Sequence, residues 1–213
     1  QQTRVATVLP YYGRFLERFP DVRALEQSND DALLAAWSGL GYYSRARNLK
    51  RAAQQMNGSF PESYDEIRSL PGIGEYTAAA VASFAYGQRH AVLDTNVRRV
   101  FARAVTGVQY PPNATTAAER KLARALLPED EPTAARWAAA SMELGALVCT
   151  ARNETCVRCP IAAQCSWRLA GKPAHDGPAR RGQTYAGTDR QVRGKLLAVL
   201  REAGVAPPER AEL

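Results

Sequence analysis

All four cysteines of the chain lie within the seventeen-residue segment CTARNETCVRCPIAAQC, as Cys149, Cys156, Cys159 and Cys165. Disulfides inside this segment would close only short loops, which stabilise a fold least, and the N-terminal residues QQTRVATVLPYY lack the pattern of a secretory signal. Four neighbouring thiolates suit a zinc ion or an iron–sulfur cluster. Zinc sites usually combine two close cysteine pairs, whereas here one cysteine precedes a C-x2-C-x5-C group. The spacing therefore predicts a metal centre in a reducing compartment, with a four-cysteine zinc module as the alternative.

A second motif, SLPGIGEYTAAAV, contains Gly72 and Gly74 between two predicted helices. Glycines allow a tight turn whose backbone amides can approach a phosphate closely, and the positive end of the following helix dipole adds to the attraction. The motif predicts a sequence-independent phosphate clamp. An ordinary glycine-containing helix connection is the alternative.

The segment AVLDTNVRRVFARA delivers Asp94 to the start of a basic helix. An aspartate at this position is most often a helix N-cap. A carboxylate close to a phosphate clamp would also suit a transient cation, such as the oxocarbenium ion that forms when a base leaves its sugar. Both interpretations stay open at this stage.

A third segment, WSGLGYYSRARNLKRAAQ, places two tyrosines on a glycine turn before a basic helix. An exposed aromatic side chain beside basic residues suits insertion into a stack of DNA bases. We expect Tyr42 to have this role and Tyr43 to be part of the core. Arg45 and Arg47 are predicted to contact the DNA backbone, although a solvated helix face would look the same.

The bulk composition describes a globular protein with a basic surface. The 213 residues are 46% hydrophobic and 23% charged, with a net charge of +7 and a pI near 9.5, which is typical of nucleic-acid-binding proteins. No apolar run approaches the roughly eighteen residues of a membrane span. Helical periodicity recurs along the chain and no convincing strand is found, so the predicted class is all-α. A linker is expected over 171–190, followed by a short helix and tail over 191–213.

In combination, the segments QQT, GLGYYSRARNL, LPGIGEYTAAAV, VLDTNVRRV and ELGALVC with the cysteine group resemble the helix–hairpin–helix DNA glycosylases that carry a [4Fe–4S] cluster. Within this superfamily the chain is most similar to the branch that removes adenine opposite 8-oxoguanine or guanine in double-stranded DNA. The resemblance covers about residues 1–170. It implies a six-helix barrel lobe over about 20–100, and a cluster-bearing lobe over about 101–170 together with the N-terminal residues. The 8-oxoguanine-reading C-terminal domain of the family would only begin in 191–213.

The resemblance also implies roles for individual residues. The four cysteines, in the loop 149–165, would bind the [4Fe–4S] cluster, and Asp94 would stabilise or capture the sugar cation beside Tyr76 and Asn96. The predicted DNA contacts are Gln1, Gln2 and Thr3 near the lesion, Tyr42 beside 8-oxoguanine, the hairpin glycines Gly72 and Gly74, and Arg45, Arg47 and Arg98.

Tyr76 stands where the endonuclease III branch has a lysine that cleaves the strand, and Arg98 stands where some adenine glycosylases have a lysine that traps the abasic sugar. The resemblance therefore implies base removal without strand cleavage. A thymine or uracil mismatch glycosylase, which also carries a tyrosine at the hairpin, is one alternative, and a non-catalytic lesion-binding protein is another.

Two positions depart from the family pattern. The catalytic glutamate of the family lies a few residues before QQT, so the chain from Gln1 is expected to bind abasic or mismatched DNA but to excise adenine poorly. Thr95 replaces a glycine after the catalytic aspartate and is expected to be tolerated. The protein is expected to be a monomer in the bacterial cytoplasm, associated with the nucleoid.

Overall fold

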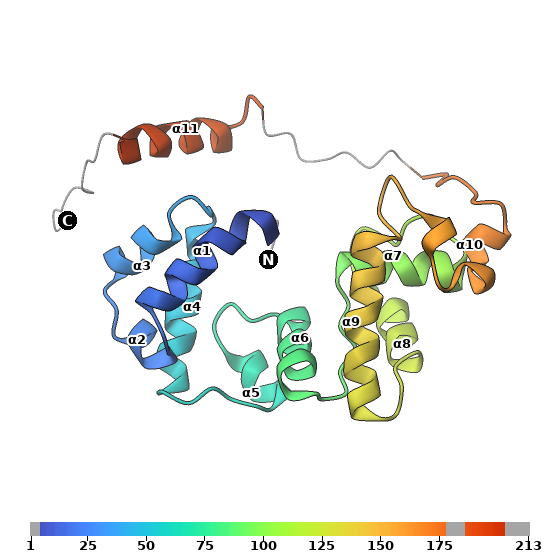
Figure 1. Cartoon of the computed structure of the whole chain (residues 1–213), viewed down its shortest axis with the longest axis horizontal. Helices are drawn as coiled ribbons and strands as arrows, with labels where there is room; N and C mark the ends of the chain where they lie inside the picture. Colours follow the sequence, from blue (N-terminus) through green and yellow to red (C-terminus); the bar gives the residue numbers. More distant parts are fainter. Residues whose placement is uncertain (1–4, 178–185, 203–213) are drawn as a thin grey trace. The chain divides into compact units, whose positions relative to one another are not determined.

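The computed structural model describes residues 5–177 and 186–202 of the 213-residue chain. The described residues form helices and no strand, which confirms the all-α prediction. The α-helices are α1 (Val5–Arg18), α2 (Val22–Glu26), α3 (Asp30–Trp37), α4 (Tyr43–Met56), α5 (Tyr64–Ser69), α6 (Glu75–Tyr86), α7 (Thr95–Phe101), α8 (Ala117–Ala125), α9 (Glu131–Leu147), α10 (Ser166–Leu169) and α11 (Asp189–Glu202) (Figure 1). A π-helical turn, η1 (Ala102–Thr106), continues α7, and two 3-10 turns, η2 (Cys156–Arg158) and η3 (Ala162–Gln164), lie between the cysteines.

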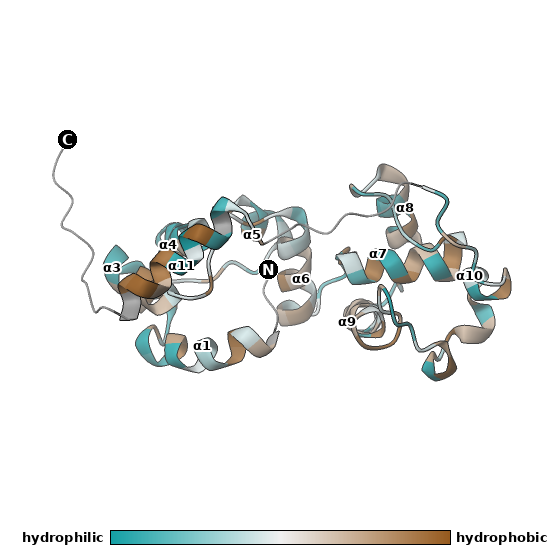
Figure 2. Cartoon of the chain, turned by 90° about the horizontal axis from the view of Figure 1, so that it is seen from above, coloured by the Kyte–Doolittle hydropathy of each residue, from teal (hydrophilic) through white to brown (hydrophobic). Residues whose placement is uncertain are grey.

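The chain divides into two compact units, Gln1–His175 and Asp176–Leu213. The second unit contains α11, which begins at Asp189 rather than at the expected residue 191. Figure 2 shows hydrophobic residues along α11, and Leu196 of this helix is 59% exposed. Among the described helices, none has the length and apolar character required to cross a membrane.

The first hydrophobic core of the larger unit joins α1 to α4. Phe19, Leu25 and Leu33 are buried there with Ala46 and Ala53 of α4. The described N-terminal helix α1 packs on α3 in this core, where the ring of Phe15 lies 6.1 Å from that of Trp37. The resemblance instead implies that the N-terminal residues belong with the cluster-bearing lobe.

A second core joins α7, α8 and α9. It contains Val97, Val100, Phe101 and Ala123, and α7 packs on α9 there. The lobe boundary expected near residue 100 falls inside α7, since Ala91 and Leu93 before this helix already pack against the second core. Local sequence could not reveal this, because the apolar face of α7 is buried by a helix about forty residues further on.

Helices α5 and α6 lie between these two cores. Ile67 of α5 packs on Ala78 and Ala82 of α6, and Ala79 of α6 packs on Ala138 of α9. Figure 1 shows α6 between α5 and α9. The alanines of α6 allow this close helix packing, and they fix the hairpin before α6 next to the start of α7.

Candidate functional site

The hairpin between α5 and α6 exposes unprotected backbone amides. Gly72 has a φ of +77°, and a Cβ there would lie 2.7 Å from the Cβ of Asn48, so both its conformation and its close packing favour glycine. Gly74 caps α6 without a side-chain hydrogen bond. The first amides of the twelve-residue α6 are thus available to an anion. This geometry fits the predicted phosphate clamp.

Asp94 is both an N-cap and an oriented carboxylate. Its Oδ1 accepts a 2.7 Å hydrogen bond from the backbone N–H of Val97, and its Oδ2 accepts a 2.7 Å bond from the side-chain amide of Asn96. The two interpretations of the sequence are therefore compatible. Thr95 is exposed at the first position of α7 and does not disturb this arrangement.

Tyr76 of α6 lies close enough to Asp94 for the two groups to interact electrostatically. Partial burial raises the pKa of the Tyr76 hydroxyl, and the negative charge of Asp94 raises it further. The phenol consequently remains protonated and neutral at physiological pH. Tyr76 is 38% exposed, so part of the residue is accessible from solvent.

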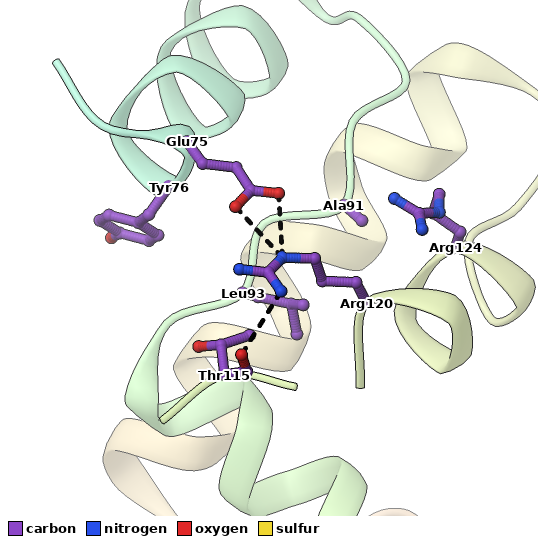
Figure 3. Close-up of a pocket in the computed structure, with 7 residues that line it drawn as sticks. All are labelled: Glu75, Tyr76, Ala91, Leu93, Thr115, Arg120 and Arg124. Carbon is purple, nitrogen blue, oxygen red and sulfur yellow. Dashed lines mark hydrogen bonds and ion pairs between the residues drawn. The ribbon is translucent and has the colours of Figure 1, made fainter. Parts of the chain in front are cut away.

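A pocket of about 100 Å³ adjoins Tyr76. Figure 3 shows Glu75 and Arg120 facing one another there, with the Arg120 Nε 3.2 Å from both carboxylate oxygens of Glu75. Arg120 and Arg124 are not among the site residues predicted from the sequence. The sequence does contain a pattern that could have identified them. The capping box formed by Thr116 and Glu119 marks the start of α8, and the four-residue spacing of the two arginines places both on one face of that helix.

Arg99 connects Asp94 to the cysteine segment. Its Nη2 donates to Asn96 Oδ1 at 2.9 Å and to the carbonyl of Gly145 at 2.6 Å, and its Nε donates to the carbonyl of Cys149 at 2.7 Å. Burial lowers the pKa of Arg99, and the neighbouring charge of Arg103 acts in the same direction. A continuous chain of hydrogen bonds therefore runs from the candidate catalytic carboxylate to the first cysteine.

Arg98 is buried, and its position does not support the predicted DNA contact. It is 8% exposed, forms a bidentate ion pair with Glu119 at 2.8 and 3.0 Å, and donates to the carbonyls of Pro112 and Ala114. The Arg98 guanidinium thus donates its hydrogen bonds to acceptors inside the protein. The basic run of the sequence suggested a solvent-facing surface, whereas Arg98, Arg99 and Arg103 all face inward.

The predicted DNA-contacting residues of the first core are largely exposed. Tyr42, the N-cap of α4, has a left-handed φ of +49° and is 47% exposed. The Arg45 guanidinium lies 5.1 Å from the centroid of the Tyr42 ring, so Arg45 orients this ring, and Arg47 is exposed on α4. Gln1, Gln2 and Thr3 lie outside the described residues.

The four cysteines are free thiols that line one cavity together with Arg103 and Trp167. Burial raises the pKa of the Cys159 thiol, and the charges of the other three cysteines add to this effect, so the four sulfurs form one electrostatic group. Within the described ranges, no three His, Cys, Asp or Glu side chains are placed to hold a single metal ion. Four sulfurs around a shared cavity suit a larger cubane, in which each iron binds a different cysteine.

Comparison with known proteins gives a consistent result. Residues 1–127 match the family of HhH-GPD superfamily base excision DNA repair proteins. The chain is 48% identical to the adenine DNA glycosylase of Mycobacterium tuberculosis (strain ATCC 25618 / H37Rv), covering 100% of this chain and 70% of that protein. It is 36% identical to the Homo sapiens adenine DNA glycosylase, covering 79% of this chain and 32% of that protein.

Two solved structures are similar to this fold. A thermostable thymine-DNA glycosylase superposes with a TM-score of 0.70 at 26% identity, over 80% of each chain. A non-covalent endonuclease III–DNA complex superposes with a TM-score of 0.68 at 23% identity, over 81% of each chain, which supports the fold alone. The predicted helix–hairpin–helix glycosylase fold is confirmed.

Proposed function

Because this chain belongs to the HhH-GPD superfamily of base excision DNA repair proteins, we propose that it removes adenine mispaired with 8-oxoguanine or guanine in double-stranded DNA. The prediction of a base excision DNA glycosylase is confirmed by this membership and by the adenine DNA glycosylases that are 48% identical over the whole chain. The base opposite the adenine and the roles of single residues are our proposal. The QQT and GLGYY segments favour the adenine branch.

The orientation of Asp94 is the observation that carries the proposed chemistry. Both carboxylate oxygens accept short hydrogen bonds, from Asn96 and from the amide of Val97, and these bonds fix the orientation of the carboxylate. When adenine leaves, positive charge develops on the sugar, and a fixed anion stabilises that charge without reorganisation. Asp94 is thus proposed to stabilise the sugar cation while a water molecule replaces the base.

DNA binding is proposed to use the hairpin and the first core. The exposed amides at Gly72 and Gly74 would hold the phosphate backbone, and the net charge of +7 adds long-range attraction. The target adenine has to leave the duplex, since its glycosidic bond cannot be reached inside the stack. Tyr42, supported by Arg45, would fill the space beside the opposite base, as would Gln1, Gln2 and Thr3.

Tyr76 supports a glycosylase that removes the base without cutting the strand. Strand cleavage requires an amine that forms a Schiff base with the opened sugar. The neutral phenol of Tyr76 beside Asp94 cannot do so. It can instead donate a hydrogen bond to the sugar or phosphate, which would help to position the nucleotide.

The cysteine segment is proposed to hold a [4Fe–4S] cluster with Cys149, Cys156, Cys159 and Cys165 as ligands. The common cavity and the cysteine-only donor set fit this group. When bound, the cluster supplies a structural cross-link, because metal ligation contributes directly to folding. The loop would then present exposed cations such as Arg152 and Arg158 to DNA. We place the monomeric enzyme on the nucleoid of a bacterial cell, where its substrate lies.

The test is base release under single-turnover conditions from duplexes that differ only at the mismatch. We expect adenine release opposite 8-oxoguanine and guanine, at the low rate expected of the chain from Gln1. We expect little release opposite thymine, and loss of the remaining activity in the Asp94→Asn variant. Release of thymine or uracil opposite guanine would instead support the second candidate, which the similarity to the thermostable thymine-DNA glycosylase favours. Tight mismatch binding without release of any base would identify a non-catalytic lesion binder.

A further inference from the structure

Arg103 is a charged side chain buried inside the second core. It is 1% exposed and is the largest fully buried side chain among the described residues. Arg103 lies in the π-helical turn that follows α7, and such turns are frequent at functional sites. Burying a cation is costly unless nearby negative charge balances it. The position of Arg103 therefore requires a partner.

The direct partners of Arg103 are neutral groups. Its Nε donates to the Gln109 carbonyl at 3.0 Å, and its Nη1 donates to the Thr150 carbonyl at 2.7 Å. The guanidinium lies 4.7 Å from the Trp167 ring centroid and 5.8 Å from that of Tyr110. These contacts satisfy its donors and leave its charge without a bonded anion.

A carboxylate that interacts with Arg103 is already paired with another cation. Glu154 interacts with Arg103 electrostatically, but its Oε1 lies 3.1 Å from Lys172 Nζ. None of the ion pairs found in residues 5–177 and 186–202 includes Arg103. The carboxylates near Arg103 therefore do not neutralise it.

The sulfur atoms of the cysteine segment adjoin Arg103 on the remaining side. Nη1 lies 3.4 Å from Cys149 Sγ, and Cys165 Sγ lies 3.5 Å from the Arg103 carbonyl oxygen. Arg103 lines the same cavity as all four cysteines. Four thiolates on an iron–sulfur cluster leave that centre with net negative charge.

We infer that Arg103 is a positioning residue whose buried guanidinium is the internal counter-charge of the four-cysteine cluster. This inference rests on the cluster assignment proposed above. The cation stabilises the negative cluster, and the hydrogen bond to Cys149 Sγ fixes the orientation of that ligand. Both effects favour retention of the cluster and raise its reduction potential, which depends on nearby charge and on hydrogen bonds to the sulfurs.

The experiment uses the purified holoprotein and three variants. Arg103→Met removes the charge and keeps the length of the side chain, and Arg103→Lys keeps the charge but loses the guanidinium fork. Arg136→Met removes an exposed positive charge from α9 as a matched control. Iron and sulfide content, the rate of iron loss to a chelator, and the one-electron reduction potential by voltammetry are measured for each protein. Circular dichroism checks that the variants are folded.

We expect Arg103→Met to lose iron roughly 10- to 100-fold faster than the parent, as is typical when a group supporting a metal ligand is removed, and to shift the potential to more negative values. Arg103→Lys should keep a potential close to that of the parent, and Arg136→Met should match the parent in both measurements. If Arg103→Met cannot be loaded while Arg103→Lys can, the inference is also supported.

Three results would overturn the counter-charge role. These are unchanged potential and iron loss in Arg103→Met, an equal defect in the lysine variant (including failure of both to load), or an equal shift in Arg136→Met. An absence of iron and sulfide from the parent protein is a different outcome, because it would refute the cluster assignment itself.

Discussion

The side-chain amide of Asn96 donates a 2.7 Å hydrogen bond to Oδ2 of Asp94, while its carbonyl oxygen accepts a 2.9 Å bond from Arg99. The arginine can only donate, so it fixes which end of the amide faces Asp94. Arg99, one turn further along α7, therefore determines that the amide nitrogen of Asn96 faces the Asp94 carboxylate. Asn96 thus links the proposed catalytic carboxylate to Arg99, which is anchored on α9.

Replacing Asn96 with alanine should slow base release with little effect on DNA binding. A hydrogen bond to a charged group contributes about 1.5–3 kcal/mol, which corresponds to a single-turnover rate roughly 10- to 150-fold lower. Asn113→Ala, at an exposed position of the loop before α8, serves as the control and should be unchanged. An Asn96→Ala variant with the parent rate would refute the orienting role.

Gly145 should tolerate no side chain, whereas Gly13 should. A Cβ at Gly145 would lie 2.7 Å from the backbone oxygen of Asn96, but one at Gly13 would meet nothing within 4 Å. We expect Gly145→Ala to separate α7 from α9, which lowers the melting temperature and displaces Asn96. Gly13→Ala should be neutral or stabilise by up to about 1 kcal/mol, since alanine favours a helix. Thermal unfolding and base release check both variants, and equal melting temperatures would contradict the packing argument.

Features set by neighbouring residues could be predicted from the sequence. The cysteine spacing, the glycine hairpin and Asp94 at a helix start each depend on a few consecutive residues, and the structure places them as expected. The burial of the three arginines, in contrast, depends on residues that are distant in the sequence. Arg98 pairs with a residue 21 positions away, and Arg99 bonds to carbonyls 46 and 50 positions away. No local pattern distinguishes such arginines from a solvated basic face.

The ion pair between Arg98 and Glu119 should give the fold a defined sensitivity to acid. Burial alone would raise the pKa of Glu119, but hydrogen bonds from Arg98 and Thr116 lower it below its ordinary value of 4.5. A depressed folded-state pKa stabilises the protein above pH 4.5, and this contribution is lost as the pH falls through the folded value.

Glu119→Gln should therefore be less stable than the parent at neutral pH, and the difference should shrink below pH 4.5. We expect a loss of about 3 kcal/mol, near the lower end for a buried pair that loses one charge. Denaturant unfolding across the pH range measures it. Glu129→Gln is the control, because Glu129 is 96% exposed in its pair with Arg89 and such pairs contribute little. A difference between parent and Glu119→Gln that is constant down to pH 2 would contradict the prediction.

Tyr42 offers a way to remove an aromatic ring without damaging the backbone. Its φ of +49° is a left-handed conformation, which costs an L-residue about 1–2 kcal/mol and a glycine almost nothing. Tyr42→Gly should thus keep the fold while weakening binding to mismatched DNA by roughly 5- to 150-fold, the equivalent of about 1–3 kcal/mol for one stacked base. Tyr12→Ala, at an exposed tyrosine of α1, should bind as the parent does. Unchanged affinity in Tyr42→Gly would exclude the stacking role.

Tyr76 should decide whether the DNA strand is cut. With a neutral phenol beside Asp94, the parent should release the base, leave the strand intact until alkali is added, and trap little covalent adduct with borohydride. Tyr76→Lys places an amine at the same position, where partial burial favours its uncharged nucleophilic form although Asp94 opposes this. We expect this variant to gain a trapped adduct and strand cleavage. Phe84→Lys, at an exposed aromatic position further along α6, should gain neither. Strong trapping by the parent itself would show that another amine reaches the sugar, and the assignment of Tyr76 as the deciding residue would then fail.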